Sequence, residues 1–332
     1  MKHKKKIILL TSGLFLAFLF LKFPAPADRI INIQNYLITV GGIISAFVIS
    51  YLSAKIFNIR AERENRQIEI DKYSDTITNF RRLIFYIMKS REFWVHYDNI
   101  AVLRKKYSDV TYEMYHSQQF SYEQVIAINK DNGLSSSTVD LYLAMFAIYG
   151  NPDLQIGSSW SLDKSASFNY TIEELIKFYE PSNAIWYYLD GRFAKHGIGD
   201  FTDTGINPLW AKHVEDLLPK INTKYKGKGF HRTIIAEIGS ECYEIIPKLI
   251  SLTKRNTGVP NILIKSFYSL LAIMGFGVVL PIIVQSISIC NSLNIFLTLS
   301  CVLATVLAIT TFLLDFLDFL NEDVHIIKNK QN

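Results

Sequence analysis

Residues 36–57 read YLITVGGIISAFVISYLSAKIF, and this stretch decides the fold class of the chain. It is an almost unbroken apolar run, and an α-helix of roughly 20 such residues crosses the ~30 Å hydrocarbon core of a bilayer. Three further runs share this composition: residues 7–23, residues 267–289 and residues 293–314. Such runs are typical of a membrane protein, and we expect four transmembrane helices arranged as two hairpins.

About 200 residues of ordinary globular composition lie between the two pairs of runs. We therefore expect a mainly α fold, with a four-helix transmembrane domain of two hairpins and an inserted α-rich cytoplasmic domain. The expected domains are residues 1–57 for the first hairpin, 58–262 for the ligand-sensing insert, 263–320 for the second hairpin and 321–332 for a cytoplasmic tail.

The second run continues without a helix breaker into the insert. From Ala54 through Arg91 the chain contains neither Pro nor Gly, which predicts one continuous helix. Apolar residues become dense again between Ile77 and Met88 at helical spacing, which indicates packing against the insert. Motion of the insert would then be transmitted to the membrane.

Local signals place further helices in the insert. Residues 137–149 predict a buried helix that ends at Gly150, and residues 230–255 predict another. Thr171 with Glu174 has the spacing of a capping box. Asn207 followed by Pro208 is typical of a helix start.

Charges beside the runs predict the orientation in the membrane. Lysines crowd residues 2–6, and Lys55 and Arg60 follow the second run, whereas Asp28 offsets Arg29 in the short loop between the first two runs. Positive charge stays on the cytoplasmic side. We expect a multi-pass protein of the bacterial inner membrane with both termini in the cytoplasm.

The N-terminal run has a second interpretation. Its lysines, its apolar stretch and the sequence Ala25-Pro26-Ala27 also resemble a signal peptide with its cleavage site. Because Lys22 and Phe23 interrupt the approach to that site, we favour retention of the segment.

Composition excludes several classes of function. The net charge of +5 comes from residues that flank the membrane runs, so the insert is neutral overall and lacks the basic footprint of a duplex-DNA-binding domain. Three scattered cysteines without C-x-x-C spacing provide neither a disulfide framework nor a metal-binding pattern. We expect no cofactor and no metal.

Two stripes in the runs are candidates for helix contacts or a pore. Small residues at four-residue spacing let helix backbones approach closely, which predicts packing within one chain or between subunits; the alternative is a narrow pore wall. This small stripe consists of Gly42, Ala46, Ser50 and Ala54.

The fourth run carries a weakly polar stripe that continues into carboxylates. Ionisable groups at a membrane edge are costly unless they meet water or partners, and a ring of them favours cations in a pore. The alternative for the carboxylates is the start of an exposed tail. The candidate pore-lining residues are Thr298, Cys301, Thr305, Ala308, Asp315 and Asp318.

The third run contains Gly275, Gly277 and Pro281. Helix breakers inside a membrane helix mark bends, so these residues indicate either a gating hinge or a static kink.

One basic loop is the best candidate for a ligand site. Glycines expose backbone N–H groups, a helix start favours anions, lysines add charge and aromatic rings stack on bases, which together suit a phosphate-bearing ligand. A solvated loop and a lipid-headgroup contact are the alternatives, and the spacing is not that of a Walker motif. The candidate residues are Lys220, Lys224, Tyr225, Lys226, Lys228, Phe230, His231 and Arg232.

A second loop carries the weaker signal of an enzyme. His196, Asp200 and Asp203 lie around Gly197 and Gly199, and such groups can perform acid/base chemistry. A cluster of this kind is far more often structural, so we expect no enzymatic activity.

The layout of the chain resembles the membrane effectors of bacterial antiphage systems, in particular the Hailong-type effectors. The resemblance rests on paired apolar hairpins around a soluble insert, on the helix of residues 54–91 and on the loop of residues 220–232. In those effectors an ion-channel domain carries a soluble domain that binds a nucleic-acid signal. The resemblance implies a ligand-gated channel and assigns no role to individual residues.

We therefore expect a homo-oligomeric, channel-like effector, since four helices of one chain do not easily enclose an aqueous path. Its partners would be further copies of itself, the lipid bilayer and a nucleotide or single-stranded oligonucleotide. Two alternatives stay open. One is a pore-less, membrane-anchored sensor or interaction protein, and the other is a membrane enzyme acting on a lipid or phosphate ester.

Overall fold

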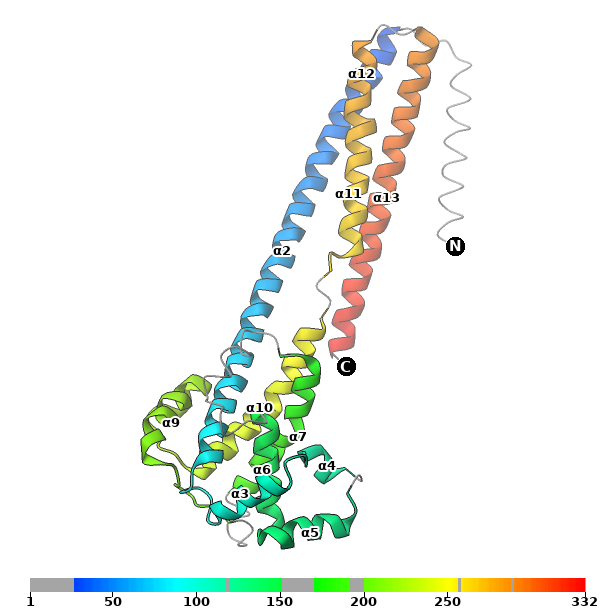
Figure 1. The fold of residues 1–332 in the computed structure, drawn as a ribbon. Helices are drawn as coiled ribbons and strands as arrows, with labels where there is room; N and C mark the ends of the chain where they lie inside the picture. Colours follow the sequence, from blue (N-terminus) through cyan, green and yellow to red (C-terminus); the bar gives the residue numbers. More distant parts are fainter. Residues whose placement is uncertain are drawn as a thin grey trace. The chain divides into compact units, whose positions relative to one another are not determined.

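The computed structural model describes residues 27–117, 120–150, 170–190, 200–255, 258–287 and 290–331. The described residues are mainly helical and contain no β-strand, which confirms the predicted fold class at this level (Figure 1). An isolated antiparallel bridge joins Trp94 and Phe201. The first apolar run, residues 7–23, and the interpretation of it as a signal peptide lie outside these residues.

The chain divides into two compact units. Unit 1 consists of residues 1–63 and 257–332, and unit 2 of residues 64–256. The finer expectations, four transmembrane helices in two hairpins and both termini in the cytoplasm, stay predictions.

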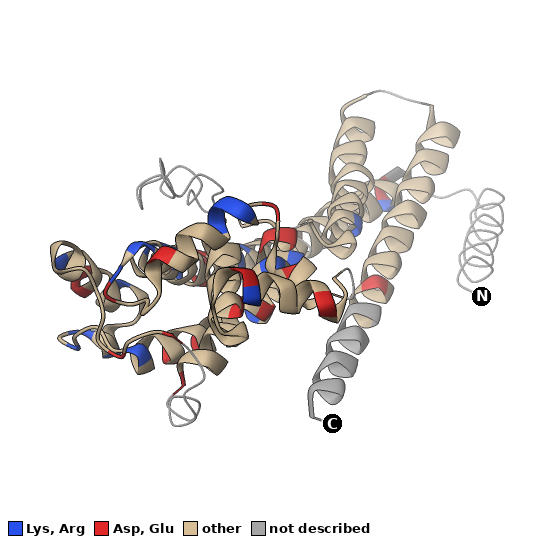
Figure 2. Ribbon diagram, turned by 60° about the horizontal axis from the view of Figure 1, so that its bottom comes forward, with Lys and Arg blue, Asp and Glu red and all other residues tan. Residues whose placement is uncertain are grey.

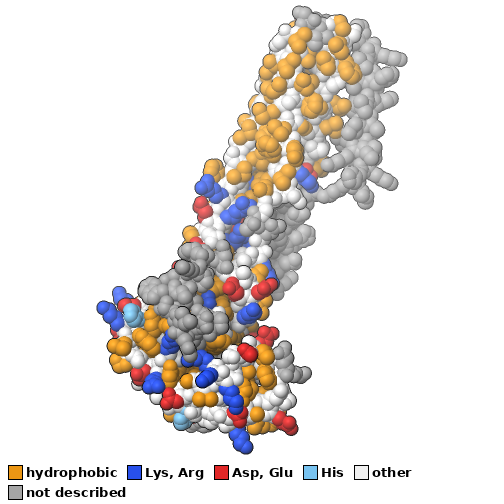
Figure 3. All heavy atoms as spheres, in the orientation of Figure 1, with side chains coloured by type: hydrophobic (Ala, Val, Ile, Leu, Met, Phe, Trp, Pro, Cys, Tyr) orange, Lys and Arg blue, Asp and Glu red, His pale blue; other side chains and the backbone are white. Residues whose placement is uncertain are grey.

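Unit 1 contains three described helical segments that are long and apolar enough to cross a membrane, as expected of a membrane protein. Hydrophobic side chains cover most of their visible surface in Figure 3, and few charged residues occur on them in Figure 2. The elements are the first part of α2 (Ala27–Lys89), α11 (Asn261–Met274), the π-helical turn η3 (Gly275–Val279), α12 (Leu280–Ser286) and α13 (Asn291–Gln331).

Three helices of unit 1 meet at a point that requires glycine. A Cβ atom on Gly41 of α2 would lie 3.0 Å from the backbone carbonyl of Gly277 in η3. A Cβ atom on Gly277 would lie 3.2 Å from Cγ2 of Thr305 in α13. The glycines that predicted a hinge or kink in the third run lie in a π-helical turn, and Gly277 lets the neighbouring backbones approach. The hinge or kink itself stays a prediction.

Amide side chains link the helices at one end of unit 1. Nε2 of Gln34, which is 1% exposed, donates to Oδ1 of Asn294 at 2.8 Å and to Oγ1 of Thr298 at 2.7 Å. Nε2 of Gln285 donates to Oδ1 of Asn35 at 3.0 Å. Hydrogen bonds between membrane helices stabilise their association modestly, so these contacts fix the register of α2, α12 and α13.

Unit 2 is built from the second part of α2 and eight further described elements. The elements are α3 (Tyr97–Lys106), α4 (Tyr112–His116), α5 (Tyr122–Asn132), α6 (Ser136–Tyr149), α7 (Ile172–Leu189), α9 (Pro208–Ile221), η2 (Thr223–Tyr225) and α10 (Arg232–Lys254).

Several predicted helix ends are confirmed. Thr171 and Glu174 form the capping box of α7, and the Asn207 side chain caps α9, which begins at Pro208. Helix α6 ends at Gly150, whose φ of 70° is left-handed and favours glycine. The helix predicted to continue through Arg91 ends at Lys89 instead.

The core of unit 2 surrounds the end of α2. Leu83, Ile84 and Ile87 are fully buried there, as the helical spacing predicted. Helices α7 and α10 pack so closely that a Cβ atom on Gly239 would lie 2.9 Å from the carbonyl oxygen of Ser182.

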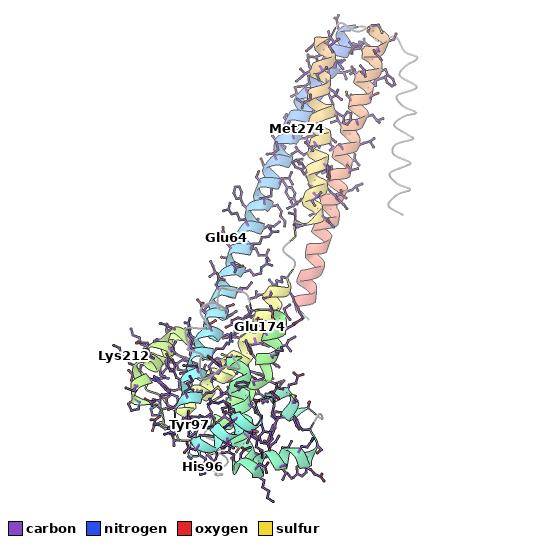
Figure 4. All side chains as sticks on the ribbon, in the orientation of Figure 1. Glu64, His96, Tyr97, Glu174, Lys212 and Met274 are labelled. Carbon is purple, nitrogen blue, oxygen red and sulfur yellow. The ribbon has the colours of Figure 1, made fainter. Side chains whose placement is uncertain are left out.

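The start of unit 2 can be followed in Figure 4, which labels Glu64, the first residue of the unit, on α2 and Glu174 on α7.

A buried arginine ties α2 to α6. The guanidinium of Arg81 donates to the carbonyl oxygens of Ile148 at 2.9 Å and Tyr149 at 2.7 Å, the last residues of α6. It also lies 5.1 Å from the ring centroid of Phe178 in α7. Because a cation that caps helix carbonyls is stabilising, Arg81 holds three helices together.

Candidate functional site

The membrane part of α2 exposes a continuous seam of small and polar residues. A Cβ atom added to Gly42 would meet no heavy atom of the described residues within 4 Å, so these residues leave the space beside this glycine open. Gly42 is half-buried, whereas the other residues of the seam are exposed. They recur at spacings of three and four, which places them along one side of the helix. The α2 seam consists of Asn35, Thr39, Gly42, Ala46, Ser50, Ser53 and Ala54.

The hydroxyl groups of the α2 seam are satisfied within the helix. Oγ1 of Thr39 donates to the carbonyl oxygen of Asn35, and Oγ of Ser50 donates to that of Ala46, each at 2.9 Å. The seam is therefore compatible with an apolar neighbour such as another helix. Among the described residues, Gly42 of the small stripe has no close neighbour, and whether the stripe packs within the chain, packs between chains or lines a pore stays a prediction.

The polar stripe of α13 is buried, in contrast to the exposed α2 seam. Thr298, Cys301, Thr305 and Ala308 are 3%, 4%, 1% and 7% exposed. They pack inside unit 1, and Thr305 contacts the glycine crossing described above. In this arrangement the four side chains do not face solvent, and their role in lining a pore stays a prediction.

The carboxylates that follow this stripe are placed only in part. Asp315 is half-buried on α13. Asp318 also belongs to this helix, but its side chain lies outside the described residues. Their role at the mouth of a pore stays a prediction.

The two aromatic residues of the basic loop are core residues. Tyr225 is fully buried and Phe230 is 8% exposed, so neither ring presents an open face to a base in this structure, and their role in ligand binding stays a prediction. The Tyr225 hydroxyl donates to Oε1 of Glu241 at 3.1 Å. Burial, with the nearby Glu241 carboxylate, raises the pKa of Tyr225, so its hydroxyl remains a donor.

Two cations of the loop are paired with carboxylates of unit 2. The Lys224 ammonium forms an ion pair with Glu241. Nε of Arg232 lies 3.6 Å from Oδ1 of Asp203, and its guanidinium packs over the ring of Phe201. These contacts hold the loop in place and leave little capacity for an external phosphate.

The remaining basic residues of the loop stay in solvent. Lys226 and Lys228 flank Gly227, whose φ of 75° is left-handed, and His231 precedes the first residue of α10. Lys220, Lys226, Lys228 and His231 are all exposed. An anion that approaches the start of α10 would meet these groups first.

The carboxylates of the second loop have structural contacts. Oδ2 of Asp200 accepts from the backbone N–H of Ser135 and from Oγ1 of Thr138, both at 3.2 Å, and thereby holds the start of α6. Asp203 lies beside Arg232. His196 lies outside the described residues. Within the described part of the chain, no group of three histidine, cysteine or acidic residues is placed to hold a metal ion.

A polar cluster around Asp140 was not predicted. Asp140 is 3% exposed on α6, and its carboxylate contacts Nε2 of His116 from α4 and the hydroxyl of Tyr188 from α7. The hydrogen bond with Asp140 raises the pKa of His116 against the opposing effect of burial. The signal in the sequence was a carboxylate inside an apolar, buried helix. The cluster clamps α4 onto the core.

No known protein family, curated protein or solved structure matches this chain.

Proposed function

We propose that this protein is a homo-oligomeric, channel-like membrane effector that is controlled by a phosphate-bearing ligand, a nucleotide or an oligonucleotide, bound to unit 2. The single observation that carries the proposal is the α2 seam. A seam of small residues with open space beside Gly42 is a surface on which a second membrane helix packs closely. The path would then form between chains, next to α2.

The continuity of α2 supports regulation by unit 2. One helix, Ala27–Lys89, provides the seam in unit 1 and a central part of the core in unit 2. Because packed helices shift as rigid elements, a ligand that changes the packing around Leu83 or Ile87 changes the position of α2 as a whole. In this proposal α2 carries the signal in either direction.

The exposed cations of the basic loop support an anionic ligand. Lys226, Lys228 and His231 surround the start of α10 without a carboxylate partner in the described part of the chain. With the aromatic residues buried, recognition depends on phosphate charge, so we expect a strong dependence of affinity on salt. A role in antiphage defence follows only from the resemblance in layout.

Flux from liposomes tests the proposal. We expect the purified protein to release potassium when an oligonucleotide is added. Gly42→Phe should abolish this release because the large ring blocks the α2 seam, whereas Val40→Phe, on another exposed face of the same helix, should preserve it. Equal release from both variants, or no release from the wild type with oligonucleotides or mononucleotides, would refute the channel.

A pore-less sensor is the second candidate, and one observation favours it. The seam hydroxyls bond within α2 and the polar stripe of α13 is buried, so the described helices present no continuous polar wall. In this alternative, ligand binding would change the association of chains without ion flux. Oligomerisation that responds to the oligonucleotide while liposomes stay sealed would favour the sensor over the channel.

A further inference from the structure

The charged side chains of unit 1 are confined to the ends of its apolar helices. On α2 no charged residue occurs between Arg29 and Lys55, and from α11 through α13 none occurs between Lys265 and Asp315. At the end where α2 leaves the unit, four basic residues stand against two carboxylates among the described side chains. These residues are Lys55, Arg60, Arg63 and Lys265, with Glu62 and Asp315.

Arg63 is held at the start of α11 by a backbone contact. Its Nη2 donates to the carbonyl oxygen of Gly258 at 3.0 Å, two residues before the N-cap residue Pro260. A guanidinium has five N–H donors, so this contact leaves most of them for another acceptor. Neither Arg63 nor Lys265 forms an ion pair with a side chain that the structure describes.

Lys265 lies on the outer face of α11. Leu263 and Ser266 are 6% and 3% exposed and face the interior of unit 1, whereas Lys265 is exposed. Tyr268, three residues further along, lies on the same outer face and is also exposed. An ammonium group one turn from an exposed tyrosine is typical of the boundary between hydrocarbon and water.

Both basic residues lie just beyond the apolar part of their helices. Phe57 on α2 and Phe267 on α11 are exposed aromatic residues near its limit. At 1.5 Å per residue, Arg63 is about 9 Å beyond Phe57 along the helix, and Lys265 is about 3 Å beyond Phe267. The headgroup layer extends roughly 5–7 Å from the hydrocarbon core, and long basic side chains reach back toward it.

We propose that this end of unit 1 binds phospholipids that carry an anionic headgroup. Arginine and lysine hold phosphate oxygens through charge-assisted hydrogen bonds, and basic residues beside membrane helices favour anionic over zwitterionic lipids. Exposed apolar side chains of the same helix, such as Ile264 and Leu271, would contact the acyl chains. This surface is separate from the basic loop of unit 2 and does not depend on the proposed channel.

Titration of the lipid-depleted, full-length protein in detergent tests this surface, with bound lipid counted by native mass spectrometry. We expect the wild type to bind phosphatidylglycerol about tenfold more tightly than phosphatidylcholine. Arg63→Gln combined with Lys265→Gln should remove this preference and leave the affinity for phosphatidylcholine unchanged. Lys177→Gln combined with Lys248→Gln, an equal loss of exposed charge in unit 2, should behave as the wild type.

Three outcomes would overturn the proposal. The first is equal affinity of the wild type for the two lipids, and the second is an equal loss of preference in both double variants. The third is displacement of phosphatidylglycerol by millimolar glycerol phosphate, which would indicate a site for a free phosphate instead of a lipid surface.

A single variant keeps the test decisive if Arg63→Gln fails to fold. Lys265 has no polar partner among the described residues, so Lys265→Gln removes a charge without breaking a contact. This variant should weaken phosphatidylglycerol binding about fivefold. Unchanged affinity in the folded Lys265→Gln protein would contradict the proposal.

Discussion

Gly41 and Gly42 are neighbours on α2, yet they face opposite environments. A Cβ atom on Gly41 would lie only 3.0 Å from the backbone of Gly277, whereas a Cβ atom on Gly42 would meet no atom of the described part of the chain within 4 Å. The difference shows that small residues on one helix serve two purposes. One face completes packing between the described helices of the chain, and the other is the face on which we propose that a second chain packs.

The basic loop of unit 2 shows the same division. Lys224, Tyr225 and Arg232 are engaged by carboxylates of their own unit, while Lys226 and Lys228 remain in solvent. Lys228 does lie over the Tyr225 ring, 5.6 Å from its centroid, but neither lysine has a carboxylate partner among the described residues. In both regions the residues with fewer contacts in the fold are the better candidates for function, because the others already have a role in the fold.

The largest effect should come from the glycine pair. Gly41→Ala forces the backbones of α2 and η3 apart and should destabilise the protein by about 2 kcal/mol. Gly42→Ala should be neutral or gain up to ~1 kcal/mol from helix propensity. Unfolding of the purified variants in detergent measures both changes in stability. Equal stability of Gly41→Ala and Gly42→Ala would contradict the difference in environment between the two glycines.

The next effect concerns the exposed lysines. Lys226→Ala with Lys228→Ala removes two charge-assisted contacts and should weaken oligonucleotide binding at least about tenfold, ~1.4 kcal/mol. Lys177→Ala with Lys248→Ala, an equal loss of charge elsewhere in unit 2, is the control. The same affinity in both double variants would remove the loop from the ligand site.

A smaller effect is expected from the amides near the end of unit 1. Gln34→Leu loses the hydrogen bonds to Asn294 and Thr298 and should cost about 1 kcal/mol of stability. Asn35→Leu, on the exposed face, loses only the contact with Gln285 and should cost about half as much. Unfolding in detergent should rank the two in this order, and the reverse order would contradict the assignment of buried and open faces.

The smallest effect is a pH dependence of the Asp140 cluster. Because the pKa of His116 is raised in the folded protein, its contribution to stability is fully present below the unfolded value of ~6.5 and is lost as the pH rises through the folded value. Tyr112, Tyr115, Tyr188 and Glu180 also face this cluster.

Comparison of the wild type with His116→Gln measures this contribution. His116 is half-exposed, so we expect a difference of about 0.5 kcal/mol after solvent screening, largest at acidic pH and vanishing at alkaline pH. A stability difference that grows as the pH rises would contradict the prediction that His116 stabilises the fold in its protonated form.

Hydrophobic runs and helix caps predicted much of the fold. The helices around Ile77, Ser137 and Thr171 follow from short-range spacing and capping, which the sequence displays directly. The environment of a stripe does not follow in this way, because a helix face is buried or open only once its neighbours are placed. Thr305 was predicted to line a pore for this reason, although Gly277 packs against it.

The candidate ligand site shows the same limit. The cluster of basic residues from Lys220 to Arg232 was visible, but the carboxylates that pair with it, Glu241 and Asp203, come from other parts of unit 2. Asp140 was visible as a charge in an apolar helix, yet its partners His116 and Tyr188 lie on two further helices. Only tertiary packing brings these groups together.

Disulfide cross-linking tests most directly whether the α2 seam joins chains. In a Cys290→Ser background, which removes the exposed native thiol, Ala46→Cys places a cysteine on the seam. Val40→Cys places one on another exposed face, about 120° around the helix. We predict that oxidation in membranes cross-links the Ala46→Cys protein into dimers and leaves the Val40→Cys protein monomeric; equal cross-linking, or cross-linking of Val40→Cys alone, would contradict it.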